Sequence, residues 1–374
     1  MNKKDENINI VISSTFTSEP IKDYIIWWCK QFNINCDIKF AKYNQVFQEL
    51  LDNTSLISSN KGINILLIRI EDWLKYSNKF IENNYTLLEE KISQLKQILL
   101  NKKKTAKYFI GLFPISSYLV GEDREKLDKL NQLWFKTIKE IKEIEILNFF
   151  ELEKDYDIRV VYDHVRNRIG HIPFQDEYYA AMGTVVARRI CADFKPKFKV
   201  IIVDCDNTLW KGICGEVGAE GIEVDKDFLK LQNFLLKQYE RGVLLAICSK
   251  NNEEDVKRVF EKNIYMPLQF SHFIITKINW KLKSENIKEI AKELNLGLDS
   301  MIFIDDSMAE CHDVMLNCPE VLTLNLPTHS VDIPFFIKHI WGLDYKNISK
   351  EDMKRTQMYK QERERQAYRK KALH

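Results

Sequence analysis

An apolar run from Phe198 to Val203 leads directly into two aspartates that lie one residue apart, Asp204 and Asp206. Such a run is typical of a buried parallel strand and places both carboxylates at the C-terminal end of that strand. Open α/β sheets bind their ligands at this end. Two carboxylates this close repel each other and stay ionised most easily beside a hard cation such as Mg²⁺. Cys205 between them offers nothing that Mg²⁺ prefers, so its presence needs another reason.

Length and composition predict a two-domain protein of mixed charge. The 374 residues suffice for two ordinary domains, and 56 Lys and Arg against 54 acidic residues leave a formal net charge of +2. This balance gives no general drive toward nucleic acid or an anionic membrane. The first residues lack the apolar core of a signal peptide, and no apolar run approaches the roughly 18 residues of a membrane span. We expect a soluble cytoplasmic protein whose eight cysteines are mostly reduced core residues.

Strand-like and helix-like segments alternate in both halves of the chain, which predicts parallel sheets covered by helices. In the first half, strands are expected at 9–14, 36–42, 63–70 and 107–114, and helices at 21–32, 45–52, 87–100 and 124–143. The predicted fold class is α/β, with a flavodoxin- or SGNH-like first domain. The predicted organisation is an N-terminal α/β domain at 1–155, a connector at 156–196, a catalytic domain at 197–343 and a charged helical tail at 344–374.

Two polar groups in the first half leave alternatives open. The hydroxyl-rich loop from Ser13 to Thr17 could cap the following helix or donate to an anion, and capping or turn formation is favoured. The pair Asp163-His164 and the nearby His171 could be remnants of a hydrolase dyad. Spacing assigns them no serine partner, so a structural role is favoured.

Further polar groups stand at strand ends and at a helix start in the second half. A predicted strand from 243 to 248 ends in Ser249-Lys250-Asn251, which precedes an acidic helix start and forms a predicted anion cradle. Lys283 opens another helix, from which its charge could reach a phosphoryl group. A third strand, 301–304, ends in Asp305-Asp306-Ser307. Each group alone is weak, but their order along the chain is informative.

Four motifs in this order, Asp-x-Asp-x-Thr, Ser, Lys and Asp-Asp, resemble the haloacid dehalogenase (HAD) phosphohydrolase superfamily. The resemblance implies a HAD-like Rossmannoid sheet, with Asp204 as nucleophile and Asp206 as general acid and base. It implies that Mg²⁺ is bound by Asp204, the Asp206 carbonyl and Asp306, with Asp305 in support. Ser249 and Lys283 would hold the phosphoryl oxygens, and Thr208 is expected to hydrogen-bond within the loop and fix the nucleophile.

A longer stretch, from Val203 to Gly218, looks like the FkbH-like branch of that superfamily, as do 248–252, 280–287, 303–307 and 351–359. This chain departs from the branch at Lys211, where a second glycine is usual, and at Ser307, where Asn is common. The resemblance implies glyceryl transfer in polyketide biosynthesis. The substrate would be 1,3-bisphosphoglycerate, and its glyceryl unit would pass through an enzyme cysteine to the phosphopantetheine thiol of an acyl carrier protein.

The cysteine that carries the glyceryl unit is predicted from position. Cys205, flanked by the two aspartates, is preferred to Cys214 and Cys248. Neighbouring carboxylates oppose this choice because they raise the pKa of a thiol. The segments 211–242 and 251–271 are too short for a large cap domain, so we expect a site open to a carrier-bound thiol. A plain Mg²⁺-dependent phosphatase is the alternative, and a non-catalytic scaffold is disfavoured by the complete motif set.

Overall fold

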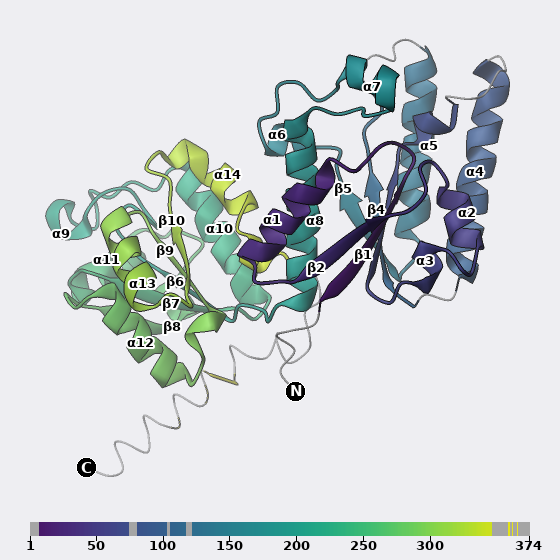
Figure 1. Ribbon diagram of the computed structural model, residues 1–374. Helices are drawn as coiled ribbons and strands as arrows, with labels where there is room; N and C mark the ends of the chain where they lie inside the picture. The colour runs from purple at the N-terminus through teal and green to yellow at the C-terminus, as the bar shows by residue number, and fades with distance from the viewer. Residues whose placement is uncertain are drawn as a thin grey trace. The chain divides into compact units, whose positions relative to one another are not determined.

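Two five-stranded parallel sheets organise the chain (Figure 1). The computed structural model describes residues 7–74, 81–102, 105–116, 122–345, 358, 359, 361 and 365. Contacts divide the chain between Cys191 and Ala192 into a first and a second unit, each built on one sheet. Most of the predicted tail helix, and most of the 351–359 motif, lie outside the described residues.

The first unit has the strand order β2-β1-β3-β4-β5, which is the order of flavodoxin-like sheets. The strands are β1 (Ile8–Ser14), β2 (Cys36–Phe40), β3 (Ile63–Ile68), β4 (Lys107–Leu112) and β5 (Ile144–Asn148). All six residues of β3 are buried, as expected of a central strand covered on both faces.

Helices cover both faces of this sheet. They are α1 (Ile21–Gln31), α2 (Val46–Leu51), α3 (Leu56–Ser59), α4 (Ile81–Asn101), α5 (Glu122–Lys139), α6 (Leu152–Asp155), α7 (His164–Gly170) and α8 (Asp176–Phe194). The helices α2, α3, α4 and α5 share one apolar cluster with β3 and β4. Figure 1 shows α1 beside α8, away from α4 and α5. A Cβ added at Gly183 of α8 would lie 2.5 Å from the Tyr24 Cβ of α1, so these two helices approach closely at that glycine.

The second unit has the strand order β10-β9-β6-β7-β8. The strands are β6 (Val200–Val203), β7 (Leu244–Ser249), β8 (Phe273–Ile278), β9 (Met301–Asp305) and β10 (Leu322–Asn325). The chain runs outward from β6 to β8 on one side, then returns to β9 and β10 on the other. The strand order therefore reverses between β6 and β9.

Helices sandwich this second sheet as well. They are α9 (Cys214–Val217), α10 (Lys226–Glu240), α11 (Glu253–Lys262), α12 (Lys283–Leu294), α13 (Met308–Asn317) and α14 (Ile333–Lys338). One apolar cluster joins the sheet to α10, α11 and α14, and a second joins it to α12 and α13. Alternate residues of β6 enter opposite clusters, with Ile201 and Val203 in the first and Val200 and Ile202 in the second.

Several segments differ from their sequence-based expectations. The strands β5, β8 and β10 were not predicted, because β5 follows directly on a long charged helix and β8 and β10 carry polar residues such as Thr276, Lys277 and Thr323. The expected capping of α1 by the 13–17 loop is wrong, because Pro20 holds the N-cap position without a side-chain hydrogen bond. Within the predicted connector, 156–196, the helix expected at 176–190 is confirmed as α8, whereas α7 was not predicted. Across the described ranges, no helix is long and apolar enough to cross a membrane.

Candidate active site

The register of the second sheet brings three strand ends together. Val203 of β6 pairs with Ile304 of β9 on one side and with Ile247 of β7 on the other. The residues that come next in the chain therefore lie side by side at the carboxyl edge of the sheet: Asp204 after β6, Asp305 in β9 and Cys248 in β7. This edge is also where the strand order reverses, the position at which open α/β sheets form their ligand crevice.

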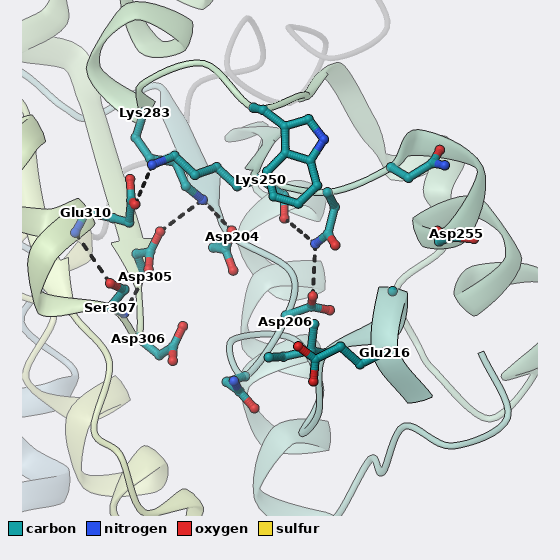
Figure 2. A pocket seen from close by; sticks show the side chains of 17 residues that line it. Asp204, Asp206, Glu216, Lys250, Asp255, Lys283, Asp305, Asp306, Ser307 and Glu310 are labelled. Carbon is teal, nitrogen blue, oxygen red and sulfur yellow. Dashed lines mark hydrogen bonds and ion pairs between the residues drawn. The ribbon is translucent and has the colours of Figure 1, made fainter. Parts of the chain in front are cut away.

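Lys283, the first residue of α12, links all three strand ends (Figure 2). Its Nζ donates a hydrogen bond to Asp204 Oδ1 and another, of 2.6 Å, to the Cys248 carbonyl oxygen. The same Nζ lies 3.1 Å from Asp305 Oδ2. The Lys283 side chain is only 2% exposed, so one ammonium is enclosed by two carboxylates and a carbonyl.

The shared burial of these charges shifts their pKa values. The pKa of Asp204 is raised to about 7. Burial is the main cause, Lys283 opposes it, and the charge of Asp305 adds to it. Burial lowers the pKa of Lys283, but Asp204 and Asp305 outweigh this and hold its pKa above the usual value, so the amine stays protonated. Burial and the charge of Asp305 also raise the pKa of Asp306. The single Lys283 ammonium therefore does not fully compensate the neighbouring carboxylates.

The carboxylates of Asp204, Asp305 and Asp306 are arranged as a divalent cation requires. One carboxylate oxygen from each lies within 4.8 Å of the others. Asp305 Oδ2 is buried and accepts no hydrogen bond from the described part of the chain. An all-oxygen ligand set suits Mg²⁺, and a cation beside these groups would lower their pKa values. The residues present therefore fit a magnesium ion.

Asp206 is held apart from this cluster by its own donors. Its Oδ1 accepts hydrogen bonds from Trp210 Nε1 at 2.9 Å and from the Cys214 backbone N–H at 3.1 Å. Its Oδ2 accepts one from Asn251 Nδ2 at 3.0 Å, and the same amide donates to Ser249 Oγ at 3.0 Å. Three donors from the surrounding loops thus fix the orientation of the Asp206 carboxylate, and Asn251 links it to Ser249.

Two residues that were predicted from sequence, Thr208 in the loop after β6 and Lys250 in the anion cradle, have other partners than expected. Thr208 is fully buried, and its Oγ1 accepts from the Asp306 backbone N–H at 3.2 Å, so it joins the loop after β6 to the loop after β9 rather than acting within its own loop. Lys250 lines the pocket, but its Nζ donates to Glu310 Oε1 at 2.6 Å. Thr208 therefore acts on the metal-binding loop, and the charge of Lys250 is already paired.

A pocket of about 650 Å³ opens over these groups. Its wall includes Asp204, Asp206, Ser249, Asn251, Lys283, Asp305 and Asp306, all of which were predicted from sequence. The sequence analysis did not identify Glu310 as a residue of this pocket. Its place there follows from the structure, in which it pairs with Lys250. Sequence reasoning also gave no role to Trp280, which lines the pocket while 76% exposed, or to Ile213 on the same wall. The sequence did offer one indication, because Trp280 lies only three residues before Lys283.

The three candidate cysteines are all buried. Cys205 is 0% exposed and packs in the apolar cluster with Ile201 and Val203, so within the described chain its thiol is not brought to the pocket wall. Burial raises the pKa of Cys205 far above its usual value, and Asp204 adds to this. Cys214 does not line the pocket either, but its Sγ lies 3.7 Å from Oδ1 of Asn251 on the pocket wall, and burial raises its pKa to about 12. Burial likewise raises the pKa of Cys248 to about 12.

Comparison with known proteins establishes the fold. No protein-family model matches the chain, and a search of curated proteins found no match. The N-terminal part of a Bacteroides fragilis protein, containing a phosphatase domain complexed with Mg, is 24% identical with a TM-score of 0.79, covering 93% of this chain and 97% of that one. The predicted arrangement of two α/β domains, each with a parallel sheet, is confirmed.

Two further structures are similar to about half of the chain. The acetylxylan esterase Axe2 of Geobacillus stearothermophilus is 12% identical with a TM-score of 0.37, covering 52% of this chain and 98% of its own. A lipolytic protein of the G-D-S-L family from Veillonella parvula is 12% identical with a TM-score of 0.33, covering 48% of this chain and 96% of its own. Both similarities are too low to add to the description of the fold.

Replacement of Lys283 should destabilise the chain in the absence of metal. The variant Lys283→Met retains the aliphatic volume but leaves Asp204 and Asp305 buried without their ammonium, which costs about 3–5 kcal/mol in comparable cases. Urea unfolding in EDTA should show this loss, and Mg²⁺ should restore part of it. Lys281→Met is the matched control, because Lys281 is 55% exposed and a surface pair contributes about 1 kcal/mol or less. Equal stability of the two variants would contradict the account.

Proposed function

We propose that the second unit is a Mg²⁺-dependent phosphatase of the HAD type, with Asp204 as the nucleophile. The observation that carries this proposal is the joint placement of Asp204, Asp305, Asp306 and Lys283 at the switch point of the sheet. The Bacteroides fragilis protein with the same fold contains a phosphatase domain and was crystallised with Mg, which supports the proposal.

The substrate would bind with its phosphoryl group between Asp204 and the anion-binding residues. Bound Mg²⁺ would neutralise negative charge on the phosphoryl oxygens and on the carboxylates. Lys283 supplies a fixed positive charge beside Asp204, and Ser249, whose Oγ accepts from Asn251, has its hydroxyl hydrogen to donate on the same wall. These groups reduce the repulsion between the incoming phosphoryl group and the Asp204 carboxylate, which is the main obstacle to nucleophilic attack.

Asp206 would transfer the protons. In the first step the Asp204 oxygen forms a bond to phosphorus while the bond to the leaving oxygen breaks, and protonated Asp206 gives its proton to that oxygen. In the second step water attacks phosphorus, Asp206 takes a proton from it, and the bond to Asp204 breaks. The hydrogen bonds from Trp210, Cys214 and Asn251 orient Asp206 for both transfers.

Phosphatase activity should depend on Mg²⁺ and on Asp204. With p-nitrophenyl phosphate as substrate, EDTA should abolish turnover and added Mg²⁺ should restore it. Asp204→Asn should reduce kcat by at least about 1,000-fold, because the residual rate lacks the covalent step. Asp255→Asn, on the rim of the same pocket, should stay within about threefold of the unchanged chain. Activity that survives Asp204→Asn would exclude Asp204 as the nucleophile.

We propose glyceryl transfer as a narrower function of the same site, based on the FkbH-like motifs. The residues between β6 and β7 form only α9 and α10, which supports a pocket open to the phosphopantetheine thiol of an acyl carrier protein. Cys205 is the cysteine indicated by the sequence, and Cys214, in contact with Asn251 of the pocket wall, is the second candidate. One feature favours the plain phosphatase: both lysines of the pocket wall are already paired with carboxylates, so the second phosphate of 1,3-bisphosphoglycerate would meet a mostly acidic wall.

Intact-protein mass separates the two functions. The chain is incubated with Mg²⁺ and 1,3-bisphosphoglycerate, and a holo acyl carrier protein is then added. Glyceryl transfer predicts an adduct on this chain that moves to the carrier, and Cys205→Ser or Cys214→Ser should abolish it, according to which thiol is used. Release of phosphate with no adduct on either protein would reject transfer and leave the phosphatase.

A further inference from the structure

A second group of reactive side chains lies in the first unit, around Asp72. Asp72 follows β3, Thr15 follows β1, and Tyr43 follows β2, while His171 comes from the turn between α7 and α8. In the order β2-β1-β3-β4-β5 the topological switch point lies between β1 and β3. These residues therefore meet at the edge where a sheet of this kind binds ligands.

Hydrogen bonds join the members of this group into a chain. Asp72 Oδ2 accepts from Thr15 Oγ1 at 2.8 Å, and Arg69 Nη1 lies 3.5 Å from Asp72 Oδ1. His171 Nε2 lies 3.0 Å from Asp72 Oδ1, where an N–H at Nε2 donates to the Asp72 oxygen. In that tautomer Nδ1 accepts from the Tyr43 hydroxyl. Hydroxyl, imidazole and carboxylate thus stand in the order of general-base activation.

Burial and backbone geometry separate the inner and outer members of this group. Asp72 and His171 are 5% and 4% exposed, whereas Tyr43 is 46% exposed, so only the phenol meets solvent. His171 has φ 52° and Asn44, the residue after Tyr43, has φ 53°. Left-handed backbone is uncommon outside glycine, so the loops hold His171 and the residue after Tyr43 in a conformation that few residue types adopt.

A cavity of about 310 Å³ adjoins this group at Asp72. Its wall also includes Asn44, the residue after Tyr43. The other lining residues are Val46, Phe47, Trp73 and Leu87, which are apolar, and Gln48 and Lys91, which are polar. The cavity has room for a small organic group next to the hydrogen-bonded chain.

We propose that Tyr43, His171 and Asp72 form a second reactive site, in which the Tyr43 hydroxyl takes up an acyl group from small carboxylic esters. The Tyr43 oxygen forms a bond to the acyl carbon, and its proton passes to His171 Nδ1. The alkoxide leaves and takes that proton as an alcohol. Water then attacks the acyl-tyrosine, a proton again passes through His171, and the carboxylic acid and free Tyr43 are released. Asp72 stabilises the imidazolium formed in each step.

The test compares Tyr43 with a tyrosine that lacks such partners. The full chain is treated with p-nitrophenyl acetate, nitrophenol release is followed, and acetylated tyrosines are mapped by peptide mass. Tyr265, which is 89% exposed, is the internal control. Tyr43 should be acetylated at least about 100-fold faster than Tyr265, which is the usual gain from a positioned general base. Tyr43→Phe should remove the fast release of nitrophenol.

His171→Asn tests the role of the imidazole, because Asn tolerates left-handed backbone but cannot act as the base. It should lower the Tyr43 rate to that of Tyr265 while the thermal midpoint stays close to that of the unchanged chain. If these hydrogen bonds only hold the loops together, Tyr43 should be acetylated no faster than Tyr265. The proposal is overturned if Tyr43 reacts no faster than Tyr265, or if a folded His171→Asn chain acetylates Tyr43 at the original rate. If this variant does not fold, the comparison of the two tyrosines in the unchanged chain decides.

Discussion

The contact of the Lys283 ammonium with Asp204, Asp305 and the Cys248 carbonyl is the interaction on which the second unit depends. Each partner lies at the carboxyl end of a different central strand, so a single side chain holds the ends of three strands together. The ion pairs are almost completely buried, and removing one member would leave uncompensated charge inside the protein. The same contact therefore serves the stability of the fold and the position of Asp204, the proposed nucleophile.

The pocket is divided between two hydrogen-bonded groups. One group contains Lys283 and the three clustered carboxylates, and it concentrates negative charge at a place suited to a cation. The other surrounds Asp206, which is held by Trp210, Cys214 and Asn251. Ser249, bonded to Asn251 at the end of β7, stands between them. This separation gives two aspartates one residue apart different surroundings, as their proposed roles of nucleophile and proton carrier require.

Much of this site could be predicted from the sequence, because parallel strands end at one edge and their terminal residues must meet there. The partners of individual side chains could not be predicted in this way. The contacts of Lys250 with Glu310 and of Thr208 with Asp306 join segments that lie far apart in the chain. Cys205 is instructive. Period-two alternation along the strand places it on the same face as Ile201 and Val203, which is the core face. Its position between two functional aspartates suggested a reactive role, whereas the alternation already indicated burial.

The central claim is that Asp204 forms a covalent bond to phosphorus. The most direct measurement is to quench the Mg²⁺-containing chain during turnover of p-nitrophenyl phosphate, reduce it with borohydride and map residue 204 by peptide mass. An aspartyl-phosphate is reduced to homoserine, so the account predicts homoserine at position 204 and nowhere else in the pocket. Rapid turnover with unmodified Asp204, together with inversion of configuration at a chiral phosphorus substrate, would show direct attack by water and contradict the account.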